Sequence, residues 1–427
     1  MSKTRVVVVG GGFAGIAAAV AAAKSGAQTA LLERTDLLSG AGLRAGRMNY
    51  NGKFVAAEEA KALGGGEVFE ALESIILHRA NIVDEENGYV YNTAMVDVTM
   101  RALLAKWGVD LRLEARVIDV RKKGNLVEAV VLDGSEAIEA GSFVDATGTR
   151  GGLDMCNLYG NGCSMCLYRC PTFGNRVSIA TKAGVPEMWR TRPDGQRGAL
   201  DSAMLLYKAS LAPELMKRLE RDGVVTIPLP PELVDYSKQQ RIGAARSRRQ
   251  MENLNLVDIG LSAKCVGSGP VPLDDLRKVP GLEAVLVEHP IGGGKVYAVN
   301  QVSVNSRESS LQAKGVPNVM LAGTKAGPGG GIAEAITFGI LAGHNAVRQA
   351  AGRTLLALPR TTMIGDFIEF TGEMMNPAGM TKSYSYAHDV YWKRLNDVGF
   401  YTTEAGPVHQ RIKKLGLAGV LAEKVAG

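Results

Sequence analysis

VVVVGGGFAGIAAAVAAAKSGAQTALLER, residues 6–34, is the stretch of sequence that decides the fold. It begins with four valines, which predict a buried strand, and continues through Gly10, Gly12 and Gly15 into a helix of small residues. A second apolar run follows and ends at Glu33. The order strand, glycine turn, helix, strand is typical of a βαβ unit that binds a dinucleotide.

Each residue of this motif has a physical task. Gly10 makes the tight turn, Gly12 lets the backbone approach a pyrophosphate, and Gly15 lets the helix pack close to the strand. Glu33 lies 18 residues after Gly15, where a carboxylate accepts hydrogen bonds from the adenosine ribose. With Arg34 beside it, Glu33 completes the predicted adenosine contacts. A βαβ turn without a ligand is the alternative.

Two later segments extend the nucleotide-binding pattern. Residues 143–148, FVDATG, form an apolar strand that ends in Ala-Thr-Gly. Residues 317–324, PNVMLAGT, form another strand, which is followed by a glycine-rich loop at 327–331 and an apolar helix over 332–348. Because an FAD molecule is extended, its two ends need two separate binding elements, and this chain supplies them. The predicted cofactor contacts here are Ala146, Gly148, Gly323, Gly331 and Ile332.

These pieces resemble the FAD fingerprints of the glutathione-reductase-type flavoprotein superfamily. There, the Ala-Thr-Gly strand closes the nucleotide domain, and the late strand–glycine–helix unit brings backbone N–H groups to the flavin end. The usual pattern carries Asp after the late glycine as a ribityl ligand, where this chain has Thr324. The resemblance further implies that Arg44 or Arg47, in the loop after Glu33, meets the pyrophosphate or the substrate. It also implies that the backbone at Val117 meets the adenine.

The late segment LAGTKAGPGGGIAEAITFGILAGHNAV, residues 321–347, allows a narrower comparison. It is similar to the corresponding stretch of the GidA and TrmFO flavoproteins, which modify uridines in tRNA. The resemblance covers the FAD-binding ends of the chain. It implies an alternative activity, flavin-dependent RNA modification, with RNA as the partner. TrmFO-type flavoproteins are also known for catalytic cysteines, but none of these aligns with a cysteine of this chain.

Composition is that of an ordinary globular enzyme. The chain has 427 residues, of which 46% are hydrophobic and 22% charged, and it can bury a large core. The formal net charge of +6 is compatible with anionic partners, FAD included. We expect no membrane span, no signal peptide and a cytoplasmic location, because no apolar run reaches about 18 residues. Five cysteines do not suggest a secreted disulfide framework.

The expected fold is α/β: a Rossmann-like parallel-sheet FAD-binding domain with an inserted α+β substrate or cap domain and a helical C-terminal tail. Alternating residues over 110–131, with a turn at Gly124, predict a three-stranded insert on the FAD domain. The aromatic-rich tail suggests a packing arm or a homodimer contact. The predicted segments are 1–155 and 296–358 for the FAD domain, 156–295 for the cap and 359–427 for the tail.

A cysteine run is the second notable feature. Cys163, Cys166 and Cys170 form C-x₂-C-x₃-C-P, and Cys265 lies far downstream. One interpretation is thiol redox chemistry beside the flavin, with Arg169 lowering a thiol pKa. A second is an iron–sulfur cluster, because the spacing matches the final part of the bacterial ferredoxin run. Structural zinc and ordinary buried cysteines are further alternatives. We take these four cysteines as the candidate catalytic residues and predict no other metal ligands.

The predicted function is FAD-dependent oxidoreduction. The flavin would pass hydride or electrons to a small-molecule or thiol substrate in the cap region, with the cysteines as relay or nucleophile. NAD(P)H would bind only transiently as a donor, because the glycines at 267–269 lead into prolines instead of a helix. A non-catalytic flavin-binding assembly factor is the remaining alternative. The sequence has no Walker A loop and no G-x-S-x-G elbow.

Overall fold

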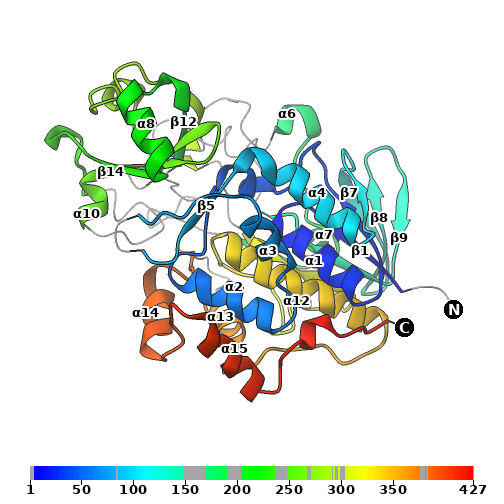
Figure 1. The fold of residues 1–427 in the computed structure, drawn as a ribbon. Coiled ribbons are helices and arrows are strands. Elements are labelled where there is room, and N and C mark those ends of the chain that lie inside the picture. The colour runs from blue at the N-terminus through cyan, green and yellow to red at the C-terminus, as the bar shows by residue number, and fades with distance from the viewer. Residues whose placement is uncertain are drawn as a thin grey trace.

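A five-stranded parallel sheet lies at the centre of the protein (Figure 1), in the order β20-β10-β1-β2-β6. The structure, a computed structural model, describes residues 4–82, 85–148, 169–189, 203–236, 248–266, 271–290, 292–293, 297–298, 303–375, 380 and 383–426. The strands of the sheet are β1 (Arg5–Val9), β2 (Gln28–Leu32), β6 (Asp110–Arg112), β10 (Ser142–Asp145) and β20 (Val319–Leu321). The opening and late motifs therefore belong to one sheet, as the sequence predicts.

The first helix and the late helix pack directly on each other. α1 (Phe13–Lys24) and α12 (Ile332–Ala350) run side by side over the sheet (Figure 1). The contact is close because both surfaces are built from small residues. A Cβ atom at Gly339 would overlap the carbonyl oxygen of Ala14, and one at Gly343 would overlap that of Ala18. The late segment is thus fixed to the first βαβ unit by backbone contact.

The predicted three-stranded insert is confirmed, with one correction. β7 (Val117–Lys123), β8 (Leu126–Leu132) and β9 (Ala137–Glu139) form an antiparallel sheet, and the turn at Gly124 has φ +61°. Residues 110–112 do not belong to it. They form β6 and pair in parallel with β2, because three residues are too few for an alternating pattern to show which sheet they join.

A second, antiparallel sheet forms the inserted α+β unit, drawn in green in Figure 1. Its order is β13-β14-β15-β12-β16. One face packs with the amphipathic helix α8 (Pro213–Asp222) into a separate core, whereas the opposite face meets Ile82 and Val90 of the first unit. The strands are β12 (Ala203–Tyr207), β13 (Val224–Pro228), β14 (Asn253–Asp258), β15 (Ser262–Val266) and β16 (Val287–Pro290).

Smaller sheets connect the two units. β3 (Arg47–Met48), β5 (Tyr89–Tyr91) and β4 (Ile76–His78) form one of them, and its last strand reaches the inserted unit, where His78 Nε2 lies 3.0 Å from Asp258 Oδ2. β11 (Glu187–Trp189) pairs with β19 (Ser303–Asn305). The segment 169–189 therefore packs on the parallel-sheet unit, although it falls within the range expected for the cap.

The C-terminal tail is helical, as predicted, and some of its aromatic residues lie in the core. α13 (Met363–Glu373) and α15 (Ala405–Lys414) pack against α2 (Gly52–Ala62), and α14 (Asp389–Asp397) lies on the same side of the protein (Figure 1). The ring centroid of Phe367 lies 4.4 Å from that of Tyr386 and 4.6 Å from that of Tyr391, and both tyrosines are fully buried. These rings are part of the core. Within the described ranges, no helix combines the length and the apolar character that crossing a membrane requires.

Candidate cofactor and active site

The glycine turn between β1 and α1 uses its glycines in different ways. Gly10 has φ +105°, and a Cβ there would meet the Ala146 carbonyl at the end of β10. A Cβ at Gly15 would overlap the Gly10 carbonyl oxygen. Gly12, the N-cap of α1, has no neighbouring atom within 4 Å of the position of a Cβ. Open space at a helix N-terminus, where N–H groups lack intrahelical partners, suits a phosphate.

Glu33 follows β2 and is held by backbone donors. Its Oε2 accepts from the N–H of Gly11 at 2.7 Å, and its Oε1 accepts from the N–H of Thr35 at 2.9 Å. A carboxylate has about four acceptor sites, so capacity remains for a ribose hydroxyl. The N–H of Ala115 donates to the Glu33 carbonyl at 2.9 Å. This bond brings the start of β7, with Val117, to the same edge of the sheet.

The cysteine run ends beside this edge of the sheet, which is the predicted adenosine edge. Arg34 donates to the Gly174 carbonyl at 2.7 Å, and Arg169 forms an ion pair with Asp36. The segment from Arg169 to Gly174 contains α6 (Cys170–Phe173), whose first residue, Cys170, is buried. Cys170 is therefore placed with the residues that follow β2, and Arg34 is engaged with the protein backbone.

The late glycine unit begins where β20 ends. The N–H of Ala322 donates to the Asp145 carbonyl at 3.0 Å, so the ends of β20 and β10 adjoin. Gly323 has φ +61°, and a Cβ at Gly148, φ +68°, would lie 4.0 Å from Thr324 Oγ1. Thr324, the position that differs from the superfamily pattern, is thus next to the Ala-Thr-Gly strand.

The start of α12 is the second helix N-terminus of the site. Gly331 is its N-cap, with φ +147°, and Ile332 is its first residue. Glu334, nearly fully buried, turns back so that a Cβ at Gly331 would overlap its Oε2. Its Oε1 accepts from Ser385 Oγ at 2.7 Å and from the N–H of Tyr386 at 2.8 Å. Glu334 therefore fastens the tail to this end of α12.

The segment 39–53, called the strained loop here, leads from the residues after β2 through β3 into the first turn of α2. Ser39, Asn49 and Asn51 all have positive φ, at 71°, 64° and 53°. Non-glycine residues adopt this backbone at a cost and cluster at functional sites. The loop returns to the glycine turn, since the N–H of Ser39 donates to the Gly11 carbonyl at 2.7 Å. It therefore passes from the phosphate end of the site toward the start of α12.

Three side chains of this loop form a cluster, in which Lys53 and Arg47 are buried and Tyr50 is partly buried. The Lys53 ammonium donates to Tyr50 Oη at 2.8 Å, and it lies 3.2 Å from where a Gly331 Cβ would be. Burial alone would lower the pKa of Lys53, but Tyr50 and Glu334 raise it above its ordinary value. The Arg47 guanidinium stacks on the Tyr50 ring and pairs with Glu85. A positive charge is thus kept beside the start of α12.

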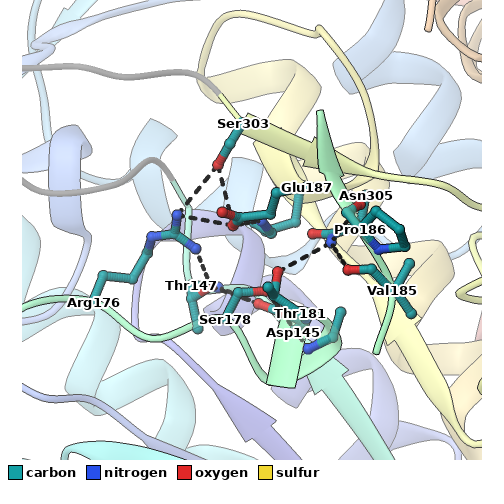
Figure 2. Close-up of polar contacts among 12 residues, drawn as sticks. Asp145, Thr147, Arg176, Ser178, Thr181, Val185, Pro186, Glu187, Ser303 and Asn305 are labelled. Atoms are coloured by element: carbon teal, nitrogen blue, oxygen red, sulfur yellow. Dashed lines mark hydrogen bonds and ion pairs between the residues drawn. The ribbon is translucent and has the colours of Figure 1, made fainter. Parts of the chain in front are cut away.

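A buried ionic network lies next to the ends of β10 and β20 (Figure 2). Lys325, with no exposed surface, donates to Glu187 Oε1 at 2.6 Å, and Arg176 donates to the same oxygen at 3.1 Å (Figure 2 draws the Arg176 contact). Burial lowers the pKa of Lys325 to about 8. Burial would raise the pKa of Glu187, but Lys325 and Arg176 outweigh it and lower that pKa to about 2.

Asp145 extends this network to the segment after the cysteine run. Its Oδ2 accepts from Ser178 Oγ at 2.6 Å and from the N–H of Ala180 at 3.0 Å, and its Oδ1 accepts from Thr147 (Figure 2). The Arg176 guanidinium also reaches Thr147 Oγ1 at 3.3 Å. The segment 176–187 is therefore fixed on the sheet by charged and polar groups from β10 and from the late glycine unit.

These residues fit FAD. At one end, open space at Gly12 lies next to the carboxylate of Glu33, as a pyrophosphate and a ribose require. At the other end, the α12 N-terminus and the Lys53 ammonium offer positive charge to an electron-rich ring edge. The two ends are joined by the α1–α12 contact. An extended dinucleotide is the kind of ligand that needs binding groups at both of these ends.

Two of the four predicted catalytic cysteines, Cys163 and Cys166, lie outside the described residues. Cys265 lies in the core of the inserted unit, and burial raises its thiol pKa to about 12. A thiol that stays protonated is a poor nucleophile, so this environment does not favour the predicted catalytic role. Within the described parts of the chain, no three His, Cys, Asp or Glu side chains are grouped as metal ligands.

Sequence reasoning missed four charged residues of the site: Lys53, Lys325, Arg176 and Glu187. Lys325 stands two positions after Gly323, next to the residue that departs from the superfamily pattern, and this was the available signal. The others carry no local signal, because their burial depends on partners far away in the chain. Arg47 was predicted to contact the cofactor or the substrate, and the structure pairs it with Glu85.

Comparisons with known proteins agree with this geometry. A family model described as FAD dependent oxidoreductase matches residues 5–151, and one described as Glucose inhibited division protein A matches residues 271–354. The structure of GidA from Aquifex aeolicus in one crystal form is similar over 97% of this chain and 76% of that chain, with 18% identity and a TM-score of 0.68. A second crystal form of the same protein is similar over 97% of this chain and 78% of that chain, with 18% identity and a TM-score of 0.65. The protein is an FAD-dependent oxidoreductase, and it resembles the GidA flavoproteins.

Proposed function

We propose that this protein uses FAD to oxidise or reduce a substrate held between the start of α12 and the antiparallel sheet. FAD supplies hydride and single-electron chemistry, whereas the protein binds and orients the reactants. The observation that carries the proposal is the position of Lys53, a buried ammonium beside Gly331 at the N-terminus of α12. A buried cation at this point suits a group that gains negative charge during the reaction.

The roles of the site residues follow from this arrangement. The N–H groups of the first turn of α12, from Ile332 on, would hold the carbonyl edge of the flavin ring together with Lys53. Tyr50 orients Lys53 through their 2.8 Å hydrogen bond. Gly12 and Glu33 would hold the pyrophosphate and the ribose at the opposite end. With these roles assigned, the strained loop would line the site beside the reacting part of the cofactor.

The cysteines enter the proposal as relay or nucleophile. Cys163 and Cys166 form a C-x-x-C pair, which brings two sulfurs within reach of each other. Cys170 ends the run at the adenosine edge, and Cys265 is set aside because burial keeps its thiol protonated. NAD(P)H is the proposed transient electron donor. An iron–sulfur cluster held by Cys163, Cys166 and Cys170 is the alternative use of the same residues.

Anaerobic reduction of the FAD-loaded protein tests the proposal. NADH, NADPH or a dithiol is expected to bleach the flavin absorbance, and Cys163→Ser should abolish turnover while FAD stays bound. Cys265→Ala is the matched control and should keep full turnover. A bound flavin that no donor reduces would favour the non-catalytic assembly factor. Iron and sulfide analysis of the same preparation distinguishes a cluster from plain thiols.

RNA modification is the second candidate function. It is supported by the match of residues 271–354 to the GidA family model and by the fold similarity to GidA. Under this proposal the purified protein binds tRNA or rRNA, and the affinity falls steeply with salt because phosphate contacts release counterions. Absence of RNA binding at low salt would remove this candidate and leave a small-molecule or thiol substrate.

A further inference from the structure

The inserted unit reaches into the strained loop through one side chain, Lys264 of β15. Its ammonium donates to the carbonyl of Arg44 at 2.9 Å and to that of Ala45 at 2.7 Å. Arg44 is the last residue of the short helix η1 (Gly40–Arg44), where carbonyls lack intrahelical partners. Lys264 therefore caps this turn of the loop from a different sheet.

Further contacts surround the same junction. Gly46 has φ +72°, and a Cβ there would overlap the Ile259 side chain at the end of β14. The Ile259 carbonyl accepts from the N–H of Thr93 at 3.1 Å and from its hydroxyl at 2.7 Å. Arg44 pairs with Glu288 of β16 at 3.1 Å. The β14–β15 hairpin is thus seated on the loop and on the residues that follow β5.

The pleat of β15 fixes the direction of Lys264. Ala263 and Cys265 are buried in the core of the inserted unit, so Lys264 and Val266 point to the opposite face, because neighbours in a strand alternate. Val266 packs there with Ile82 and Val90 of the first unit. A one-residue change of register would remove Lys264 from the loop. Its position is therefore set by the whole sheet.

We propose that Lys264 is a positioning residue: by capping the carbonyls of Arg44 and Ala45 it holds the strained loop so that Tyr50 and Lys53 stay beside the start of α12. The inference rests on the proposed function, in which that loop borders the cofactor. The physical reason is that Asn49 and Asn51, with left-handed backbone, need outside contacts to keep the loop in this conformation. The link is made to backbone carbonyls, so it requires the cation at 264 and no particular side chain at 44 or 45.

The test is Lys264→Met in the full-length, FAD-reconstituted protein. We expect about tenfold weaker FAD binding, because the loop loses both carbonyl contacts of one charged group, and a changed visible circular dichroism spectrum of the bound flavin. Lys264→Arg should restore both, because a guanidinium keeps the donors. Lys278→Met, an exposed lysine of the same unit that pairs with Asp275, is the control and should leave both unchanged.

Two outcomes decide the inference. A Lys264→Met protein with wild-type FAD affinity and an unchanged visible spectrum overturns it, even if its unfolding midpoint is lower. Should Lys264→Met not fold, Lys264→Gln removes the charge and shortens the side chain at the same position. It should give the same signature, and an unchanged FAD affinity and spectrum there also overturn the inference.

Lys53→Met separates this inference from the proposed function. An unchanged flavin spectrum in Lys53→Met means that the loop does not border the cofactor, and the proposed function fails. A changed spectrum in Lys53→Met together with an unchanged one in Lys264→Met removes only the positioning role.

Discussion

Gly343 of α12 lies against the carbonyl of Ala18 in α1, so closely that a Cβ atom at position 343 would overlap the carbonyl oxygen. Gly339 makes the same contact with Ala14 one helical turn earlier. These contacts bring the backbones of two helices together at the centre of the protein. The relationship ties the glycine turn at the start of α1 to the glycine-rich turn at the start of α12, the two proposed ends of the cofactor site.

Gly343→Ala should therefore destabilise the protein by about 1–3 kcal/mol, the usual cost of adding a methyl group to a packed interface. Urea denaturation followed by circular dichroism measures this change. Gly406→Ala, in the exposed helix α15, is the control: a Cβ there meets nothing within 4 Å, and the exchange should be neutral or slightly stabilising. Equal effects at both positions would contradict the close helix contact.

Gly12 and Gly15 should separate cofactor binding from folding. Gly12→Ala adds a methyl group to open space, so we expect a folded protein whose FAD affinity falls at least about tenfold, because the backbone approach to the pyrophosphate is blocked. Gly15→Ala should lower both affinity and stability, since its methyl group meets the Gly10 carbonyl. Flavin fluorescence titration and thermal unfolding measure the two effects. Normal FAD binding by Gly12→Ala would place the pyrophosphate elsewhere.

Glu187→Gln should be strongly destabilising. It leaves the buried cations Lys325 and Arg176 without their carboxylate, and breaking a buried ion pair in this way costs about 3–5 kcal/mol. The control is Asp275→Asn, which removes the partner of the exposed Lys278 and should change stability by less than about 0.5 kcal/mol. Similar unfolding midpoints for the two variants would show that the network is not worth more than a surface pair.

His344 should make folding stability depend on pH. It is buried in α12, with Nδ1 at 2.9 Å from Ser25 Oγ, and burial lowers its pKa from 6.5 to about 4. Between these values the unfolded chain binds a proton that the folded protein does not, so stability falls as the pH is lowered. The contribution lost between pH 7.5 and pH 5 is about 2 kcal/mol.

His344→Gln removes this titration, and comparing urea unfolding of the variant and the wild type at pH 7.5 and pH 5 isolates it. If His344→Gln has the same pH dependence as the wild type, the histidine is not neutral in the folded protein.

Cys265 should be unreactive in the native protein. Burial raises its pKa to about 12, so the thiolate that attacks alkylating reagents is scarce at pH 8. We expect iodoacetamide to label Cys265 only after unfolding in urea, as measured by mass spectrometry of tryptic peptides. Labelling of Cys265 in the folded protein as fast as in urea would reopen its role as nucleophile.

The nucleotide-binding motifs could be predicted from the sequence, because the spacing of Gly10, Gly12 and Gly15 is set by local backbone geometry. The parallel sheet and the hairpin at Gly124 could likewise be predicted from local sequence patterns. The ionic network could not be predicted in this way. Whether Lys325 is buried depends on a carboxylate at position 187 and on the pairing of β11 with β19, which joins segments far apart in the sequence.

The contacts that hold the strained loop could not be predicted from the sequence either. Lys264 is one of many lysines in the sequence, and only the register of the antiparallel sheet brings it to the carbonyls of residues 44 and 45. The positive φ angles of Asn49 and Asn51 are likewise properties of the folded loop. Short-range patterns predict the glycine turns of the proposed phosphate site, whereas the charges around the start of α12 are assembled by long-range contacts.

The order of the strands also has a consequence for biosynthesis. The ribosome makes the phosphate turn first, but β20 and α12, which complete the sheet and cover α1, come from the last third of the chain. Until residue 350 has emerged, the face of α1 that packs on α12 lacks this partner, and only one of the two proposed ends of the cofactor site has been made. Loading of the coenzyme must therefore follow most of translation, and the half-made sheet is the stage at which a chaperone would be needed.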